Sequence, residues 1–327
     1  MQNKDKMNLG IMYRREHNPE NLPEFARKAE SAGFDELWVV EDCFYTSGIA
    51  SAATALACTT KIRVGLGIMP SVVRNPVFTA MEIATLAGIY PGRFLPGIGH
   101  GVAVWMRQIG AFPKSQLAAL EEVAFTVREM LAGKQVNFDG KQIHLEQAEL
   151  VFPPERVPPI SLGVTGPKSL SISGKAADGT ILPEFSSPAF VAWAKGIIEE
   201  ARTDSDLKPQ RLTVFAFACA GATKGEALEQ IRPMMTEVIS SGNIDGQLAP
   251  TGFLDSVKQW RESKDPGMKT QGIHEVWIEQ LAVVGTPQDW SEAINNFAAV
   301  GVDSLILVPL PDKSVEELDV FAGHIDN

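Results

Sequence analysis

The stretches Ala-Gly-Phe-Asp-Glu-Leu-Trp-Val-Val (32–40) and Val-Gly-Val-Asp-Ser-Leu-Ile-Leu-Val (300–308) decide the fold class. In each, a glycine typical of a helix C-terminus is followed by a short turn and then by an apolar run. The runs lack polar alternation, as strands do when helices cover both faces of a parallel sheet. Both stretches therefore predict helix-to-strand units of an α/β fold.

The same pattern continues along the chain. Eight runs are expected as strands: 9–12, 36–40, 62–68, 94–97, 160–162, 180–182, 212–218 and 304–308. Seven amphipathic stretches are expected as helices: 22–32, 77–87, 117–131, 169–176, 188–201, 226–237 and 288–299. Eight strands with interleaved helices predict a (β/α)8 TIM barrel that forms a single domain over residues 1–327. An open, doubly wound sheet is the structural alternative.

Two segments interrupt the alternation. Residues 133–157 contain two alternating runs around Asp139-Gly140, which predict a β-hairpin inserted after the fourth helix. Residues 240–275, near the seventh and eighth strands, are rich in Gly, Asp, Pro and Lys, with one amphipathic stretch at 253–263. Insertions of this kind often build lids and substrate walls. We therefore expect both segments to line the substrate pocket.

Composition and charge exclude several classes of protein. The 327 residues are 45% hydrophobic and 21% charged, as in ordinary globular proteins. Since 29 Lys and Arg stand against 40 Asp and Glu, the net charge is −11, which disfavours nucleic acid and anionic membrane surfaces as partners. Three separated cysteines, no signal-peptide pattern and no apolar run of membrane-spanning length favour the reducing cytoplasm.

Several familiar catalytic motifs are missing from the sequence. The five histidines form no HxH, HExxH or Cys/His cluster, so no metal site is expected. There is neither a GxSxG nucleophile elbow nor a Walker GxxxxGK[ST] motif. The glycine-rich run at 97–101 lacks the full GxGxxG pattern, which argues against a Rossmann dinucleotide site.

In a TIM barrel, function lies at the C-terminal ends of the strands. After the fifth predicted strand, Gly-Val-Thr-Gly-Pro-Lys-Ser (163–169) opens a helix, so free backbone N–H groups and the helix dipole favour an anion such as phosphate. A simple N-terminal cap is the alternative. Asp42 could accept hydrogen bonds from a ligand or cap a helix, and His100 could carry protons or be an inert loop residue. Cys43 is expected to be a small half-buried side chain.

Taken in order, these segments resemble the luciferase-like flavin and deazaflavin oxidoreductases. The resemblance rests on four stretches, at 9–42, 62–101, 166–181 and 284–309, and so spans nearly the whole chain. Within them, Gly-Arg-Phe-Leu-Pro-Gly-Ile-Gly-His-Gly (92–101) and Gly-Pro-Lys-Ser-Leu (166–170) are prominent. The sequence is most similar to the branch that includes the F420-dependent methylenetetrahydromethanopterin reductases.

The resemblance implies a TIM barrel that binds FMN or coenzyme F420 at its C-terminal face, and it leaves the choice of cofactor open. The implied cofactor-binding residues are Asp42, Gly67, Ile68, Gly99, Val164, Thr165, Gly166, Pro167 and Lys168. Gly67 and Ile68 match a non-prolyl cis peptide beneath the ring. His100 and Glu41 are nearby ionisable side chains and are the candidate catalytic groups.

Two departures from the family narrow the chemistry. Cys43 and Val102 stand where the F420-dependent glucose-6-phosphate dehydrogenases carry a histidine and an acid, so that sugar phosphate is not expected as substrate. The expected activity is FMN-dependent monooxygenation or F420-dependent hydride transfer on a small organic substrate. A separate flavin or F420 reductase and a homodimer are possible partners. A non-catalytic flavin-binding paralogue and a phosphate-binding barrel lyase or isomerase are the alternative functions.

Overall fold

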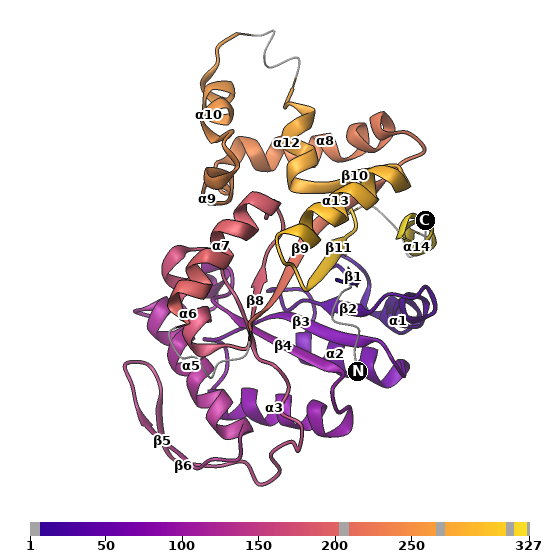
Figure 1. Cartoon of the computed structure of the whole chain (residues 1–327). Helices are drawn as coiled ribbons and strands as arrows, with labels where there is room; N and C mark the ends of the chain where they lie inside the picture. Colours follow the sequence, from indigo (N-terminus) through magenta and orange to yellow (C-terminus); the bar gives the residue numbers. More distant parts are fainter. Residues whose placement is uncertain (1–6, 203–208, 266–271, 312–316, 326–327) are drawn as a thin grey trace.

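Eight parallel strands close into a barrel in the computed structural model of the chain (Figure 1). The structure describes residues 7–202, 209–265, 272–311 and 317–325. The barrel strands are β1 (Asn8–Met12), β2 (Glu36–Val39), β3 (Arg63–Pro70), β4 (Phe94–Gly99), β7 (Ser161–Gly163), β8 (Gly179–Leu182), β9 (Arg211–Ala220) and β11 (Ser304–Val308). They correspond to the eight runs that the sequence predicts.

Continuous pairing around the ring shows the closure. The order runs from β1 through β2, β3, β4, β7 and β8 to β9, and then through β11 back to β1. Thr180 of β8 lies opposite Leu212 of β9, and that pairing joins the two ends of the sheet. The TIM barrel is therefore confirmed, and the open-sheet alternative is wrong.

Helices surround the barrel. They are α1 (Leu22–Ser31), α2 (Gly48–Cys58), α3 (Pro76–Ile89), α4 (Ala103–Gln108), α5 (Gln116–Leu131), α6 (Pro167–Ala176), α7 (Pro188–Ala201), α8 (Lys224–Ser241), α13 (Pro287–Ala299) and α14 (Glu317–Ile325). Side-chain caps define several of their starts, such as Ser187 at α7 and the capping box of Thr223 and Glu226 at α8. No helix of the described residues is long and apolar enough to cross a lipid bilayer.

Both predicted insertions carry secondary structure. The hairpin consists of β5 (Val136–Asp139) and β6 (His144–Ala148), paired antiparallel as expected. The segment 240–275 carries α9 (Asp245–Leu248) and α10 (Leu254–Glu262), and α12 (Glu275–Leu281) follows; residues 266–271 lie outside the described residues. The sequence missed β10 (Ala282–Gly285), which pairs with the last four residues of β9, beyond those that pair with β8.

The hairpin lies away from the C-terminal ends of the strands, so the expectation that it lines the substrate pocket is wrong. Phe138 of β5 borders a groove with Ile160, Asp178 and Arg211, which stand at the N-terminal ends of β7, β8 and β9. Figure 1 shows the hairpin and the helices α8, α10 and α12 at opposite ends of the molecule. A hairpin on the opposite end of the barrel cannot wall a site at the strands' C-terminal ends.

The middle of the barrel is filled by large aromatic side chains. Trp38 of β2 is fully buried and meets Phe215 of β9 edge-to-face, with 5.3 Å between the ring centroids. Gly65 of β3 leaves room for this indole, because a Cβ there would lie 2.2 Å from the ring atoms of Trp38. The barrel is therefore solid at this level, and open space is left only towards its ends.

A buried carboxylate lies on the N-terminal side of these aromatic rings in the barrel. The first residue of β2, Glu36, is fully buried and pairs with Arg63 at 2.9 Å and with Arg211. Its other oxygen accepts hydrogen bonds from Trp38 Nε1 and Ser304 Oγ, both at 2.9 Å. Burial alone would raise the pKa of Glu36, but the two guanidinium groups outweigh it and hold that pKa below the ordinary glutamate value.

Replacing Glu36 by glutamine tests this cluster. Glu36→Gln should lower the free energy of unfolding by about 3–5 kcal/mol, because Arg63 and Arg211 would keep their burial and lose their counter-charge. Urea denaturation measures the loss. The control Glu24→Gln removes an exposed helical ion pair with Lys28 and should cost less than about 0.5 kcal/mol. Equal effects of the two variants would contradict the assigned role.

Candidate active site

A cavity of about 460 Å³ opens at the C-terminal ends of the barrel strands. Seven of the eight barrel strands, or the loops that follow them, contribute to its lining. The lining residues are Met12, Arg14, Arg15, Glu16, Val40, Asp42, Gly67, Ile68, His100, Val102, Gly163, Val164, Thr165, Gly166, Ser169, Ile181, Pro183, Glu184, Phe185, Phe215 and Phe217. This is the end of the barrel at which the sequence placed the site.

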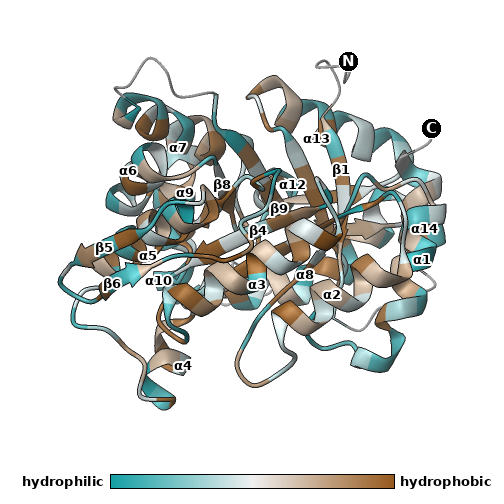
Figure 2. Ribbon diagram, turned by 90° about the horizontal axis from the view of Figure 1, so that it is seen from below, coloured by the Kyte–Doolittle hydropathy of each residue, from teal (hydrophilic) through white to brown (hydrophobic). Residues whose placement is uncertain are grey.

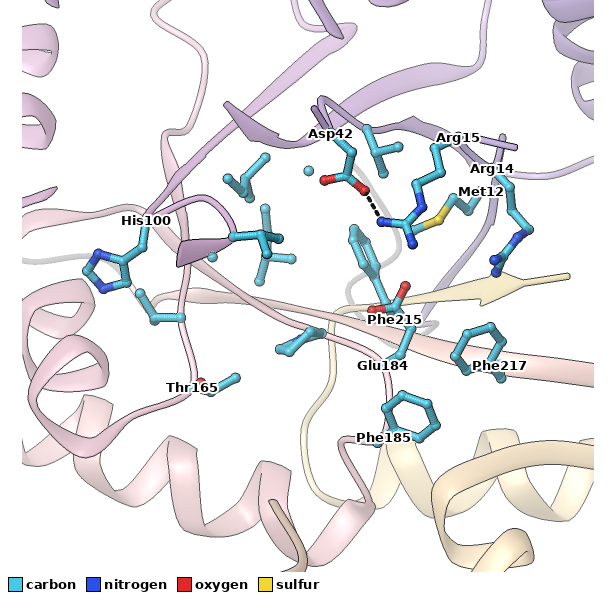
Figure 3. Close-up of a pocket in the computed structure, with 18 of the residues that line it drawn as sticks. Met12, Arg14, Arg15, Asp42, His100, Thr165, Glu184, Phe185, Phe215 and Phe217 are labelled. Atoms are coloured by element: carbon cyan, nitrogen blue, oxygen red, sulfur yellow. Dashed lines mark hydrogen bonds and ion pairs between the residues drawn. The ribbon is translucent and has the colours of Figure 1, made fainter. Parts of the chain in front are cut away.

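A network of charges occupies one side of the cavity (Figure 3). Arg15 of the loop after β1 donates to Asp42 of the loop after β2 at 2.7 Å and to Glu16 at 3.0 Å. Arg14, which is only 9% exposed, donates to Glu16 at 3.1 Å and to the carbonyl of Pro309 at 3.1 Å. Asp42 therefore lies at the cavity, as expected, and it does so with a fixed cationic partner.

Aromatic rings hold both guanidinium groups in place. Arg15 lies over Tyr45 and Trp105, with 5.1 and 5.4 Å between its Cζ and the ring centroids. Arg14 lies over Phe217 at 5.5 Å. Contacts of this kind favour a cation over the ring face, so the two arginines keep their positive charge inside an acidic protein.

The loop between β7 and α6 forms another wall of the cavity. Val164, Thr165 and Gly166 line it, whereas the neighbouring Pro167 and Lys168 are exposed and lie outside the lining. Gly166 is the N-cap of α6 without a side-chain hydrogen bond, and a Cβ on it would meet open space. The free N–H groups of the first turn of α6 can therefore receive an anion beside Gly166.

The strand β3 contributes Gly67 and Ile68, joined by the expected cis peptide bond. Gly99 does not reach the cavity. A Cβ there would lie 2.8 Å from the Ile68 side chain and 3.1 Å from the carbonyl of Gly163. Gly99 therefore makes room for the Ile68 side chain, and its expected role in cofactor binding stays a prediction.

The two candidate catalytic residues differ in position. His100 lines the cavity at its edge, where its Nε2 lies 3.0 Å from Ser169 Oγ. Burial lowers the pKa of His100, and a backbone hydrogen bond with Gln116 opposes this effect without outweighing it. Glu41 lies outside the lining: one oxygen pairs with Arg74 at 2.8 Å and the other accepts from the Gly48 N–H. The structure therefore places Glu41 as a cap of α2, and we drop it as a catalytic candidate.

Sequence reasoning missed the loops after β1 and β8. From the second of these, Glu184 and Phe185 line the cavity, and Glu184 points to the side of Asp42 and Arg15 (Figure 3). Burial raises the pKa of Glu184, with Asp42 acting in the same direction and the cations of Arg14 and Arg15 opposing it. The signal was available, because Tyr-Arg-Arg-Glu (13–16) and Pro-Glu-Phe (183–185) each follow a predicted strand directly.

Metal chemistry finds no support in the described ranges, where no group of three or more His, Cys, Asp or Glu side chains could hold an ion. Backbone donors at α6, apolar rings and paired charges make up the cavity instead. Walls of this kind fit an organic cofactor with an anionic group.

Comparison with known proteins agrees with this geometry. The model of the luciferase-like monooxygenase family matches residues 7–304. The chain belongs to this family. The expected family is thereby confirmed, and with it the expected class of enzyme, an oxidoreductase.

Relatives of this luciferase-like chain include a 5,10-methylenetetrahydromethanopterin reductase of Archaeoglobus fulgidus, which is 27% identical over 94% of this chain and 95% of its own length. The structure of the coenzyme F420-dependent tetrahydromethanopterin reductase from Methanopyrus kandleri superposes with a TM-score of 0.82 at 20% identity, covering 98% and 99% of the two chains. The FMN complex of the oxygenating constituent of 3,6-diketocamphane monooxygenase from Pseudomonas putida superposes with a TM-score of 0.74 at 19% identity, covering 98% of each chain. At such identities the two solved structures show the fold alone.

Gly166 offers a direct test of the anion wall. Its backbone angles, φ −77° and ψ 151°, suit any residue, so Gly166→Leu should fold normally and push its side chain into the open space. We expect affinity for FMN or F420 to fall about tenfold or more, a loss of about 1.4 kcal/mol. Affinity for riboflavin, or for the phosphate-free deazaflavin core, should change little. Fluorescence titration measures all four ligands.

The control is Gly196→Leu, at an exposed position of α7 where a Cβ also meets open space. It should leave every affinity unchanged. An equal loss for the phosphorylated and phosphate-free ligands in Gly166→Leu would place the phosphate elsewhere.

Proposed function

We propose that this luciferase-like protein binds coenzyme F420 in the cavity and transfers hydride between the deazaflavin and a small organic substrate. The observation that supports F420 over FMN is that the sequence relatives covering most of the chain include F420-dependent glucose-6-phosphate dehydrogenases, one of them from Kineococcus radiotolerans at 24% identity over 86% of this chain. When bound, the deazaflavin supplies a carbon that accepts or gives hydride, and it reacts poorly with oxygen because it lacks the corresponding ring nitrogen.

The residues of the cavity fit such a group. The backbone at Val164–Gly166 and the first turn of α6 would hold the phosphate, and Gly67 and Ile68 would support the ring from β3. Met12, Phe215 and Phe217 would exclude water from the reacting carbon. Protein residues thereby bind, orient and shield the ring, while the cofactor carries the redox chemistry.

A paired titration tests the proposal. Purified protein is titrated with oxidised F420 and, separately, with FMN, and binding is followed by fluorescence. We expect F420 to bind at least about tenfold more tightly, a difference of about 1.4 kcal/mol. Tighter binding of FMN would favour monooxygenation by the same cavity. Weak binding of both would contradict a redox function here.

The sequence and the cavity restrict the substrate less than they restrict the cofactor. Cys43 and Val102 stand where sugar-phosphate dehydrogenases of the family carry a histidine and an acid, and Cys43 is a free, half-buried thiol. We therefore propose an organic substrate other than glucose 6-phosphate. We also propose that the chain acts as a single domain in the reducing cytoplasm, where a separate reductase supplies reduced cofactor; three free cysteines agree with that compartment.

We propose in addition that two copies associate through α3. Phe78, Met81 and Ile89 follow one another at helical spacing along α3 and are 60%, 47% and 61% exposed. Figure 2 shows hydrophobic residues, in brown, on the open side of this helix. A stripe of large apolar side chains on the exposed face of a helix is typical of a subunit interface.

The double variant Phe78→Glu, Met81→Glu should convert a wild-type dimer into a monomer, because two charges would be buried without partners at the interface. Light scattering after size-exclusion chromatography measures the mass. Val151→Glu, Phe152→Glu is the matched control, since these side chains are 83% and 86% exposed on a loop outside α3. A monomeric wild-type protein would rule out the proposed interface.

A further inference from the structure

The carboxyl group of Glu184 differs from the other carboxyl groups of the cavity. Asp42 is ion-paired to Arg15 at 2.7 Å. Glu16 is ion-paired to Arg14 at 3.1 Å and to Arg15 at 3.0 Å. Glu184 has no ion pair among the described residues, and the hydrogen bond that it accepts comes from its own backbone N–H. It therefore combines a place in the cavity with a carboxyl group that no cation holds ionised.

The position of Glu184 is well fixed. It lies in the loop after β8, directly before Phe185, whose ring packs against Phe217 at 5.3 Å between centroids. Its carbonyl accepts a hydrogen bond of 2.7 Å from Gln247 Nε2, which comes from α9. The described residues of the segment 240–275 thus support the cavity from behind and do not line it, contrary to the sequence-based expectation.

Charged or titratable side chains from three other loops line the cavity together with the Glu184 carboxyl group. Arg14, Arg15 and Glu16 come from the loop after β1, and Asp42 comes from the loop after β2. His100, from the loop after β4, lies across the cavity (Figure 3). The strand β9 contributes only the rings of Phe215 and Phe217. Burial raises the pKa of Glu184, so that its neutral form is more populated at a given pH than that of an ordinary glutamate.

We propose that Glu184 is the general acid and base of this site, the group that exchanges a proton with the substrate heteroatom during hydride transfer. The inference rests on the proposed function. A carboxyl group that is free of ion pairs, faces the cavity and sits on a fixed loop can gain or lose a proton without breaking an ion pair.

The step balances with Glu184 as proton carrier. In the oxidative direction, a substrate H–C–X–H loses hydride from carbon to the oxidised cofactor and a proton from X to the Glu184 carboxylate, so that C=X forms. In the reductive direction, protonated Glu184 gives its proton to X while the carbon receives hydride. Two electrons move with the hydride, and the carboxyl group ends in the opposite protonation state.

His100 and Asp42 are less suited to this step. His100 Nε2 is engaged with Ser169 at the edge of the cavity, and burial favours its neutral form. Protonation of Asp42 would break its ion pair with Arg15. Glu184 can therefore change its charge at a lower cost to the surrounding contacts than Asp42 can.

The first experiment measures the protonation of Glu184 without any ligand. Because its folded pKa is raised, its contribution to stability is complete below the ordinary glutamate pKa and is lost as pH rises through the folded value. The melting temperature of Glu184→Gln relative to wild type should therefore increase as the pH rises above the ordinary glutamate pKa and through the folded value. Infrared spectra should show a protonated-carboxyl band in wild type that persists above about pH 5 and is missing in Glu184→Gln.

The second experiment measures proton transfer. Reduced F420 is mixed with a panel of small aldehydes and ketones, and its oxidation is followed by absorbance. Glu184→Gln should slow the reaction about 100-fold and abolish the pH dependence of its rate, while Glu184→Asp should restore part of the rate. Affinity for oxidised F420 should change less than about threefold. The control Glu199→Gln, on the exposed side of α7, should behave as wild type in every assay.

The outcomes separate the two proposals. If wild type binds neither F420 nor FMN, the proposed function fails, and the infrared and stability measurements still decide whether Glu184 holds a proton. If wild type binds and oxidises reduced F420 but Glu184→Gln keeps the same rate and pH profile, the role of Glu184 is overturned and the proposed function stands. A Glu184 ionised at every pH above about 5 overturns the inference in either case.

Discussion

The ion cluster around Glu36 is the contact on which the rest of the barrel depends. Glu36, Arg63, Arg211 and Ser304 are the first residues of β2, β3, β9 and β11, and the single carboxylate joins all four. Four strands that start at one buried charge have their register fixed at that end. The opposite ends of the strands are then fixed too, and the cavity can be built from short loops.

Electrostatics in this cavity are local rather than global. The chain carries a net charge of −11, yet two arginines stand in the wall, each held by a carboxylate and by aromatic rings. Paired in this way, they fix the geometry of the cavity without giving it a strong net charge. Glu184 also lines the cavity, and no ion pair among the described residues fixes its protonation state. A fixed network beside a titratable group suits an enzyme that couples proton and hydride transfer.

The sequence predicted the barrel because each of its strands is a continuous apolar run, as in Leu-Trp-Val-Val (37–40). Positions after predicted strands placed Asp42 and Val164 at the cavity, and the family resemblance placed Ile68 there. The sequence missed Arg14 and Glu184, since a charged run after a strand has the same composition as a solvated turn. The surroundings of Gly99 were also beyond the sequence, because the Ile68 side chain beside it comes from another strand and is brought there only by the folded barrel.

Ile68 also determines how the floor of the cavity could be redesigned. Its side chain lies within 3.2 Å of where a Cβ would stand at Gly97, Gly99 and Gly163, so one residue fills the space beside two neighbouring strands, β4 and β7. Shortening it would deepen the floor without touching a charged group. Replacing any of the three glycines by a residue with a side chain would require a smaller residue at position 68. An engineer seeking to admit a bulkier ligand would therefore start at this position, and related chains with different floors should vary these four residues together.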